Sequence, residues 1–364
     1  MSRLNVTAST PTTITVGTKE LLAFGGCNYL GLAHHPDVLA AMREGLARFG
    51  ISTTASRETT GNTSVHDELE RDLANLCRQE SAILLAEGYT ANIAAAQALT
   101  RDHGVALIDA KAHRSLRSAA AAAGMQIFDY EHLNPDSAAW LARQYADSGV
   151  AIFTDGVFAA DGALAPLPGL LAALPKHRAT LLVDDCHGFC VLGTRGSGSV
   201  EHFNLEDPRL CITTTLAKGL GCYGGAVIGR RAFVSSVREH ADVYRRSTPV
   251  PTPLAMAAKA AVATLARDTG LLANLRRNIG LMRDGLRELG LNPHNAPIPI
   301  FTFALAESDR MQQVHQAMLE AGIYAPFIEY PGGPTPRFFR LTVCASHTPE
   351  HIDTLMASLR KLLT

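Results

Sequence analysis

Five residues near the middle of the chain have side chains that could do chemistry. The stretch LLVDDCHGFCVLG, residues 181–193, contains Asp184, Asp185, Cys186, His187 and Cys190. The thiols and the imidazole could ligate zinc, but zinc sites commonly add a second ligand pair, and none follows here. The acids end an apolar run, where a buried carboxylate is costly unless it has a cationic partner. The acids and the histidine are therefore the stronger candidates for a functional site, and the cysteines do not form a ligand pair.

A second stretch, TTTLAKGLGCYGG at 213–225, places Lys218 just after a threonine-rich apolar run. A lysine whose pKa is lowered by its environment can form a Schiff base, and the glycines that follow allow close approach of a flat ligand. Thr215 offers a hydroxyl to a phosphate, and a helix that begins at Gly88 offers free amides. Asp184 would keep a pyridine nitrogen protonated, so that the ring acts as an electron sink. These features together indicate a pyridine cofactor with a phosphate group.

The elements around these motifs alternate between apolar strands and helices. Seven strands are expected, at residues 81–85, 106–110, 126–130, 150–155, 179–185, 211–216 and 226–229. A helix is expected from Pro135, with Asn134 as its cap. This alternation predicts an α/β fold with a mostly parallel sheet covered on both faces. Because chemistry in such sheets gathers beyond the carboxyl ends of the strands, the residues that follow the strands should meet in one crevice.

The pattern changes after about residue 250. Two long helical stretches (253–289) precede a strand, a helix at 307–321, another strand and a last helix capped by Thr348. This order predicts a smaller α+β domain at the C-terminus. The expected division is an N-terminal segment at 1–32, a large domain at 33–255 and a C-terminal domain at 256–364.

The composition narrows the possible partners and compartments. The 364 residues carry a net charge of −1 without a basic stripe, which does not favour nucleic acid or an anionic membrane as a partner. Neither a signal peptide nor a run of about 18 apolar residues is apparent. The seven cysteines include no C-x2-C pair, which is typical of free thiols in a reducing cytoplasm.

Six motifs follow one another as in a known family. They are NYLGLAHHPDV (28–38), TTASRETTGNTSVHDELERDLA (53–74), DGVFAADGALAPL (155–167), VDDCHGFCVLGTRGSG (183–198), TLAKGLG (215–221) and RLTVCASHT (340–348). In this order and spacing they resemble the α-oxoamine synthases, which are transferases of fold type I that depend on pyridoxal 5′-phosphate (PLP). The resemblance implies a mostly parallel seven-stranded sheet between helices, a smaller α+β C-terminal domain, and a homodimer with a shared active site.

The resemblance also implies a role for individual residues. Lys218 is similar to the lysine that forms the Schiff base and later transfers a proton, and Asp184 to the partner of the pyridine nitrogen. His113 matches the histidine that stacks on the ring, and His187 the residue near the phenolic oxygen. Cys186, which replaces the family's usual alanine, is expected on the ring face opposite His113.

The remaining matched positions concern the phosphate and the substrate. Gly88, Tyr89 and Thr215 match phosphate contacts, and Thr248, with Ser247, matches a segment that reaches the phosphate from the neighbouring subunit. Asn28 and Arg340 match substrate contacts. Arg340 has its own rationale, because a planar guanidinium holds a carboxylate with two hydrogen bonds.

The implied reaction condenses a small amino acid with acyl-CoA or another acyl thioester and releases CO2 to give an α-aminoketone. Ala159 stands where the family usually has serine, which leaves a racemase, decarboxylase or aldol-type reaction open. An aminotransferase would use the same lysine, but the chain lacks the N-P-x-N-P-T-G-like stretch typical of those enzymes. A non-catalytic subunit is disfavoured because Lys218, Asp184 and His113 are all retained.

Overall fold

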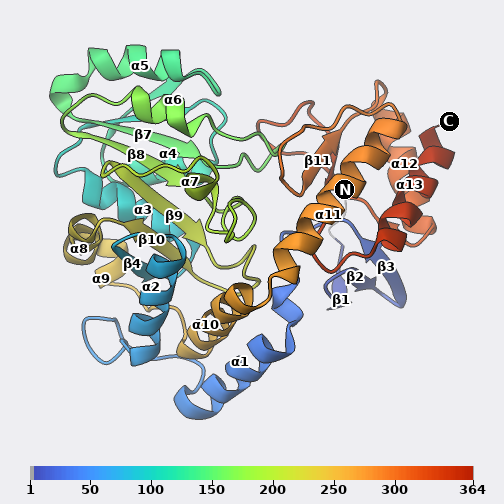
Figure 1. The fold of residues 1–364 in the computed structure, drawn as a ribbon, viewed down its shortest axis with the longest axis horizontal. Helices are drawn as coiled ribbons and strands as arrows, with labels where there is room; N and C mark the ends of the chain where they lie inside the picture. The colour runs from blue at the N-terminus through green and yellow to red at the C-terminus, as the bar shows by residue number, and fades with distance from the viewer. Residues whose placement is uncertain (1–3, 364) are drawn as a thin grey trace.

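A seven-stranded sheet lies at the centre of the larger part of the protein. Figure 1 shows a computed structural model, which describes residues 4–363. The strand order of the sheet is β4-β10-β9-β8-β7-β5-β6. The strands are β4 (Ser81–Leu85), β5 (Val105–Asp109), β6 (Gln126–Tyr130), β7 (Val150–Asp155), β8 (Ala179–Asp184), β9 (Leu210–Thr215) and β10 (Gly225–Gly229). β10 runs antiparallel to both of its neighbours, β4 and β9, and the other described pairs of this sheet are parallel. All seven predicted strands and the mostly parallel sheet are thus confirmed, each end within one residue.

Helices cover both faces of this sheet because its strands are apolar on both sides. Along β5, Leu107 joins one apolar cluster, whereas Ala106 and Ile108 join the other, as expected when successive side chains point to opposite faces. One cluster includes side chains of α3 (Gly88–Leu99), α4 (Arg114–Ala122) and α8 (Arg231–His240). The other includes side chains of α2 (Ser64–Leu76), α5 (Pro135–Gln144) and α6 (Leu167–Ala172).

The expected helix starts are present. The side chain of Asn134 accepts the N–H groups of Asp136 and Ser137 at 3.0 and 3.1 Å, which caps α5. Thr348 likewise accepts the N–H of His351 at 3.3 Å at the start of α13 (Pro349–Leu363). The remaining short helices are η1 (Leu32–His34), η2 (Ala146–Ser148), α7 (Ser199–His202) and α9 (Asp242–Arg245).

The C-terminal part combines helices with a three-stranded antiparallel sheet in the order β11-β14-β13. The strands are β11 (Ile300–Phe303), β13 (Phe327–Ile328) and β14 (Phe338–Thr342), and the helices are α10 (Thr252–Arg267), α11 (Gly270–Glu288), α12 (Ser308–Glu320) and α13. The boundary expected between residues 255 and 256 falls inside α10, which packs along α1 (Pro36–Phe49). The division into domains stays a prediction.

The N-terminal segment forms a sheet that sequence patterning did not reveal. Its strands are β1 (Val6–Ser9), β2 (Thr13–Val16) and β3 (Lys19–Ala23), and β3 pairs in parallel with β12 (Ile323–Tyr324). The beginning of the chain therefore lies against its C-terminal part (Figure 1). None of the helices described is long and apolar enough to cross a membrane.

Candidate active site

A cavity of about 290 Å³ opens beyond the carboxyl ends of the central strands. Eight of the eleven predicted site residues line it, namely Gly88, Tyr89, His113, Asp184, Cys186, His187, Thr215 and Lys218. They come from loops that follow different strands, and these loops meet at one edge of the sheet because the strands are parallel. The expected crevice is therefore present.

Lys218 lies in a tight loop between β9 and β10. The loop is closed by hydrogen bonds from Gly221 N–H to the Lys218 carbonyl and from Cys222 N–H to the Leu216 carbonyl, both 2.9 Å. Gly221 has φ +63°, and a Cβ there would clash with the backbone of Ala33, so the turn requires glycine. The loop holds Lys218 Nζ 2.8 Å from His187 Nε2.

Asp184 ends β8 and is 3% exposed, so its oxygens need partners. Asn92 of α3 donates to Oδ2 at 2.7 Å, and the backbone N–H of Cys186 donates to Oδ1 at 3.1 Å. Asn92 also donates to Ser115 Oγ at 3.0 Å. Sequence reasoning missed Asn92 and Ser115, although a lone asparagine in the alanine-rich run ANIAAAQAL was a signal.

A second buried acid, Asp155, positions the turn that carries His113. Its Oδ2 accepts the backbone N–H of His113 at 2.7 Å. Burial and the neighbouring charge of Asp184 raise the pKa of Asp155 well above its ordinary value. The His113 ring is exposed along the cavity, and its Nδ1 lies 2.7 Å from Ser115 Oγ. Partial burial lowers the pKa of His113, which favours an uncharged ring on the cavity wall.

His187 connects the lysine to the N-terminal part of the chain. Its Nδ1 lies 2.7 Å from the hydroxyl of Tyr29, a residue that is 1% exposed. Burial, together with the positive charges of Lys218 and Arg340, lowers the pKa of His187 well below its ordinary value. Tyr29 was not predicted as a site residue, although it adjoins the predicted Asn28.

The other side of the cavity is formed by the start of α3. The first amides of a helix have no acceptor within the helix, which suits Gly88 and Tyr89 to an anion. A Cβ on Gly88 would lie 2.9 Å from Thr215 Cβ and 3.2 Å from Cys186 Sγ. This crowding requires glycine and places the Cys186 thiol on the cavity wall, between the helix start and Asp184.

Three predicted site residues lie outside this lining. Asn28 Oδ1 accepts the N–H of Ala33 at 3.3 Å and so caps a turn. Arg340, on β14, donates from Nε to the Ala159 carbonyl at 2.7 Å, and its charge acts on His187. Thr248 is exposed in the loop before α10 and does not border the cavity of its own chain.

The two cysteines of the central motif are placed differently. Cys186 lines the cavity, whereas Cys190 is buried, has φ +64° and packs against Gly219. Within residues 4–363, no group of three His, Cys, Asp or Glu side chains is arranged to hold a metal ion.

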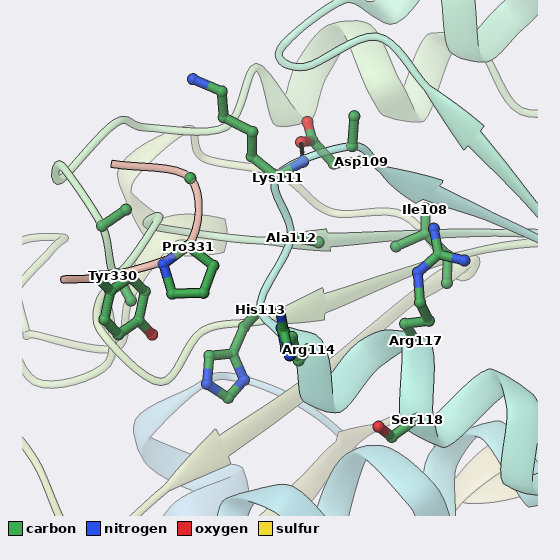
Figure 2. Close-up of a pocket in the computed structure, with 14 residues that line it drawn as sticks. Ile108, Asp109, Lys111, Ala112, His113, Arg114, Arg117, Ser118, Tyr330 and Pro331 are labelled. Atoms are coloured by element: carbon green, nitrogen blue, oxygen red, sulfur yellow. Dashed lines mark hydrogen bonds between the residues drawn. The ribbon is translucent and has the colours of Figure 1, made fainter. Parts of the chain in front are cut away.

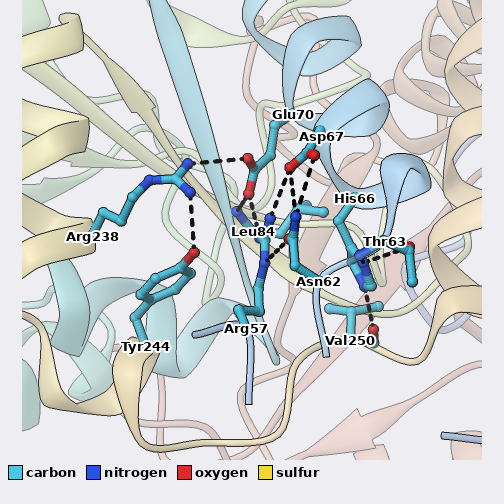
Figure 3. Close-up of polar contacts among 10 residues, drawn as sticks. All are labelled: Arg57, Asn62, Thr63, His66, Asp67, Glu70, Leu84, Arg238, Tyr244 and Val250. Carbon is cyan, nitrogen blue, oxygen red and sulfur yellow. Dashed lines mark hydrogen bonds and ion pairs between the residues drawn. The ribbon is translucent and has the colours of Figure 1, made fainter. Parts of the chain in front are cut away.

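The SRETTG motif is anchored by a buried charge network (Figure 3). Arg57 pairs with Glu70, which also accepts the N–H of Leu84 at 2.9 Å and a bond from Arg238 at 3.4 Å. Arg57 Nε donates to Asn62 Oδ1 at 2.7 Å. The network ties the loop between α1 and α2 to strand β4, so its residues act on the framework rather than in this cavity.

The residues present fit PLP, and His113 and Cys186 both line the cavity that would hold it. A buried, hydrogen-bonded carboxylate at Asp184 matches a pyridinium nitrogen, and the start of α3 beside Gly88 matches a phosphate. Lys218 lies within the same cavity, where it can form the Schiff base. When bound, PLP supplies an electron sink.

The family model for aminotransferase class I and II matches residues 19–359. The chain belongs to this family. It is 35% identical over 348 residues to 8-amino-7-oxononanoate synthase of Thioalkalivibrio sulfidiphilus, covering 94% of this chain and 88% of that protein. It is 34% identical to the enzyme of the same name from Stutzerimonas stutzeri, covering 95% and 88%.

Solved structures agree with this membership. Serine palmitoyltransferase from S. paucimobilis, with a bound PLP–myriocin aldimine, is 25% identical with a TM-score of 0.92, covering 98% of this chain and 92% of that one. The fold is also that of 8-amino-7-oxononanoate synthase from Francisella tularensis, with a TM-score of 0.80, 22% identity and coverage of 94% and 97%. The chain is thus a fold type I, PLP-dependent α-oxoamine synthase, a transferase that forms a C–C bond with decarboxylation.

Proposed function

We propose that the substrates are a small amino acid and an acyl-CoA, which the enzyme joins with release of CO2 and free CoA to give an α-aminoketone. The observation that carries this proposal is the meeting of Lys218, Asp184 and His187 in one cavity that adjoins a second, basic one. The resemblance to synthases of this reaction class supports it.

Each catalytic role is assigned from the geometry of the side chain. Asp184, fixed by Asn92, would keep the pyridine nitrogen protonated. Lys218 would hold the cofactor covalently and, once displaced by the amino acid, move the α-proton. Arg340 would hold the substrate carboxylate with its guanidinium group, whose Nε donates to the Ala159 carbonyl.

The remaining side chains would hold the cofactor in place. His113 and Cys186 would contact the two faces of the ring, and His187 its phenolic oxygen. The amides of Gly88 and Tyr89, with the Thr215 hydroxyl, would bind the phosphate. For Asn28, the observed turn-capping bond to Ala33 supports a framework role better than direct contact with the substrate.

The basic cavity is where we place the acyl-CoA. It has a volume of about 630 Å³ and lies between the turn after β5 and the segment at Tyr330 and Pro331 (Figure 2). The basic residues Lys111, Arg114 and Arg117 line this cavity. His113 and Ala159 line both this cavity and the cofactor cavity. The carboxylate that borders the basic cavity, Asp109, is bonded to the backbone N–H of Lys111 and to the His132 ring. Arg117 is ion-paired with Asp129, so Lys111 and Arg114 are the cations that suit the phosphates of CoA.

Release of free thiol tests the reaction. Purified protein loaded with PLP is mixed with an acyl-CoA series and with glycine, alanine, serine or threonine, and thiol and CO2 are measured together. We expect equal amounts of both for one pair and none with Lys218→Ala. CO2 or isomerised amino acid without thiol release would instead identify a decarboxylase or racemase, and a wild-type rate in Lys218→Ala would refute the role of the lysine.

The basic cavity has its own test. Lys111→Ala and Arg114→Ala should raise KM for acyl-CoA several-fold and leave KM for the corresponding acyl-pantetheine, which lacks the phosphates, unchanged. Arg143→Ala, which removes an exposed arginine from α5, is the matched control. Equal effects on both donors would place CoA elsewhere.

We further propose a homodimer in which Thr248 of one subunit contacts the phosphate bound by the other. The exposure of Thr248, and of Tyr89 and Tyr223 at the cavity, supports this arrangement. Mixing the Lys218→Ala and Thr248→Ala proteins after subunit exchange should restore part of the activity, because some sites then have both native residues. Monomers in sedimentation, or a mixture no more active than its components, would contradict the proposal.

A further inference from the structure

Two buried side chains, Tyr29 and His187, and the half-buried Lys218 form a continuous chain of polar contacts into the cofactor cavity. The Tyr29 hydroxyl lies 2.7 Å from His187 Nδ1, and His187 Nε2 lies 2.8 Å from Lys218 Nζ. The three residues come from the segment after β3, the turn after β8 and the loop after β9. The two ring nitrogens of His187 thus face different partners. The position of the ring proton decides which nitrogen donates a hydrogen bond and which accepts one.

The surroundings of His187 keep its ring neutral. The charged or titratable groups that act on it are Lys218, Arg340 and His113, which together with burial lower its pKa. A neutral imidazole has a single N–H, so one ring nitrogen donates and the other accepts. Either Nδ1 donates to the Tyr29 oxygen, or Tyr29 donates to Nδ1 and the proton lies on Nε2.

The surroundings of Tyr29 decide between these two possibilities. Burial raises its pKa well above the ordinary value, so the hydroxyl retains a proton that needs an acceptor. Its other close polar neighbours are Cys27 and Arg340. A guanidinium is only a donor, and a thiol is a weak acceptor. Among the described residues, His187 Nδ1 is the nitrogen or oxygen acceptor recorded within bonding distance of this hydroxyl.

We propose that Tyr29 is a positioning residue that donates to His187 Nδ1 and so fixes the ring proton on Nε2, pointing into the cavity, once Lys218 is held in the Schiff base. The free ammonium of Lys218 is only a donor and would take Nε2 as its acceptor, whereas the Schiff base leaves this nitrogen free to carry the proton. An N–H in that place is complementary to the phenolic oxygen of PLP, so the inference rests on the proposed function.

The position of Tyr29 depends on both ends of the chain. The carbonyl of Tyr29 accepts the N–H of Ala345 at 2.8 Å, and its own N–H donates to the Cys27 carbonyl at 2.8 Å. Ala345 follows β14, the strand that carries Arg340. The N-terminal segment and the C-terminal part therefore jointly orient a histidine of the central sheet.

Nitrogen-15 NMR of the histidine rings tests the tautomer in the full chain loaded with PLP. His187→Gln assigns the His187 signals. In PLP-loaded wild-type protein we expect a protonated Nε2 and an unprotonated Nδ1, and in Tyr29→Phe averaged shifts that indicate both tautomers. Tyr130→Phe, which changes an equally buried tyrosine at the outer strand β6, should leave the His187 signals unchanged.

Absorbance of the PLP-loaded protein gives a second readout. In Tyr29→Phe the pH midpoint of the yellow band should move upward by about one unit, because a ring oxygen that receives a weaker hydrogen bond holds the shared proton more tightly. A proton on Nδ1 in PLP-loaded wild-type protein would overturn the proposal, as would unchanged NMR signals and midpoint in Tyr29→Phe. Because the NMR result depends on bound PLP but not on turnover with any substrate, the inference and the proposed reaction can fail separately.

Discussion

The second acid of the central motif, Asp185, offers a quantitative test of how the site is supported. The side chain is fully buried, and its Oδ2 accepts the N–H of Ser199 at 2.7 Å. Gly156, Gly188 and Gly198 crowd around it, since a Cβ on any of them would clash with its oxygens. Burial raises the pKa of Asp185 to about 7 from an ordinary value of 3.8. It therefore holds the turn of Asp184 and His187 largely as a neutral acid below that pH.

The sign and size of the effect on stability follow from this shift. Between about pH 4 and pH 7 the folded protein keeps a proton that the unfolded chain releases, so stability falls as pH rises through this range and then levels off. At about 1.4 kcal/mol for each pKa unit, the loss amounts to about 4 kcal/mol.

The substitution Asp185→Asn removes this titration while keeping the shape. The amide oxygen can still accept the Ser199 N–H, and the amide nitrogen can donate to the Ser199 hydroxyl. The free energy of unfolding of the variant, measured relative to wild type, should therefore rise by about 4 kcal/mol as the pH increases from 4 to 7. It should not rise further at higher pH.

The assay is urea unfolding of both proteins at half-unit pH steps and equal protein concentration. Asp147→Asn, which changes an exposed acid, serves as the control and should run parallel to wild type. A difference between Asp185→Asn and wild type that stays constant from pH 4 to pH 7 would refute the buried neutral acid.

Three further substitutions test the framework of the site. Asn92→Ala removes the 2.7 Å bond to Asp184, and it should weaken PLP binding about 10- to 100-fold, as measured by fluorescence titration. Arg57→Met leaves Glu70 buried without its main partner and should lower the free energy of unfolding by about 3–5 kcal/mol, part of which Arg57→Met with Glu70→Gln should recover. Cys186→Ala should weaken PLP binding only about 2- to 10-fold, because a polarizable sulfur against a ring contributes a modest free energy; an unchanged affinity would place the thiol away from the ring.

Local patterns predicted the strands and the positions of most lining residues. Each central strand is a short apolar run bounded by polar residues, and parallel strands bring their carboxyl ends to one edge. The positions of Asp184, His187 and Lys218 in the sequence therefore predict that these residues meet. The capping roles of Asn134 and Thr348 could also be predicted, because a helix cap depends on residues only two or three positions away.

Contacts between distant parts of the chain could not be predicted from local sequence patterns. Tyr29 and His187 are 158 residues apart in the sequence, and Asn92 and Asp184 are 92 residues apart. No local sequence pattern therefore predicts either contact. The pairing of β3 with β12 likewise depends on how the C-terminal part packs. The order of residue types along the chain already placed two acids, a histidine and a lysine at the sheet edge. That Tyr29 rather than Asn28 contacts His187 depends on the fold, because the burial and hydrogen bonding that select between neighbouring side chains exist only once the chain has folded.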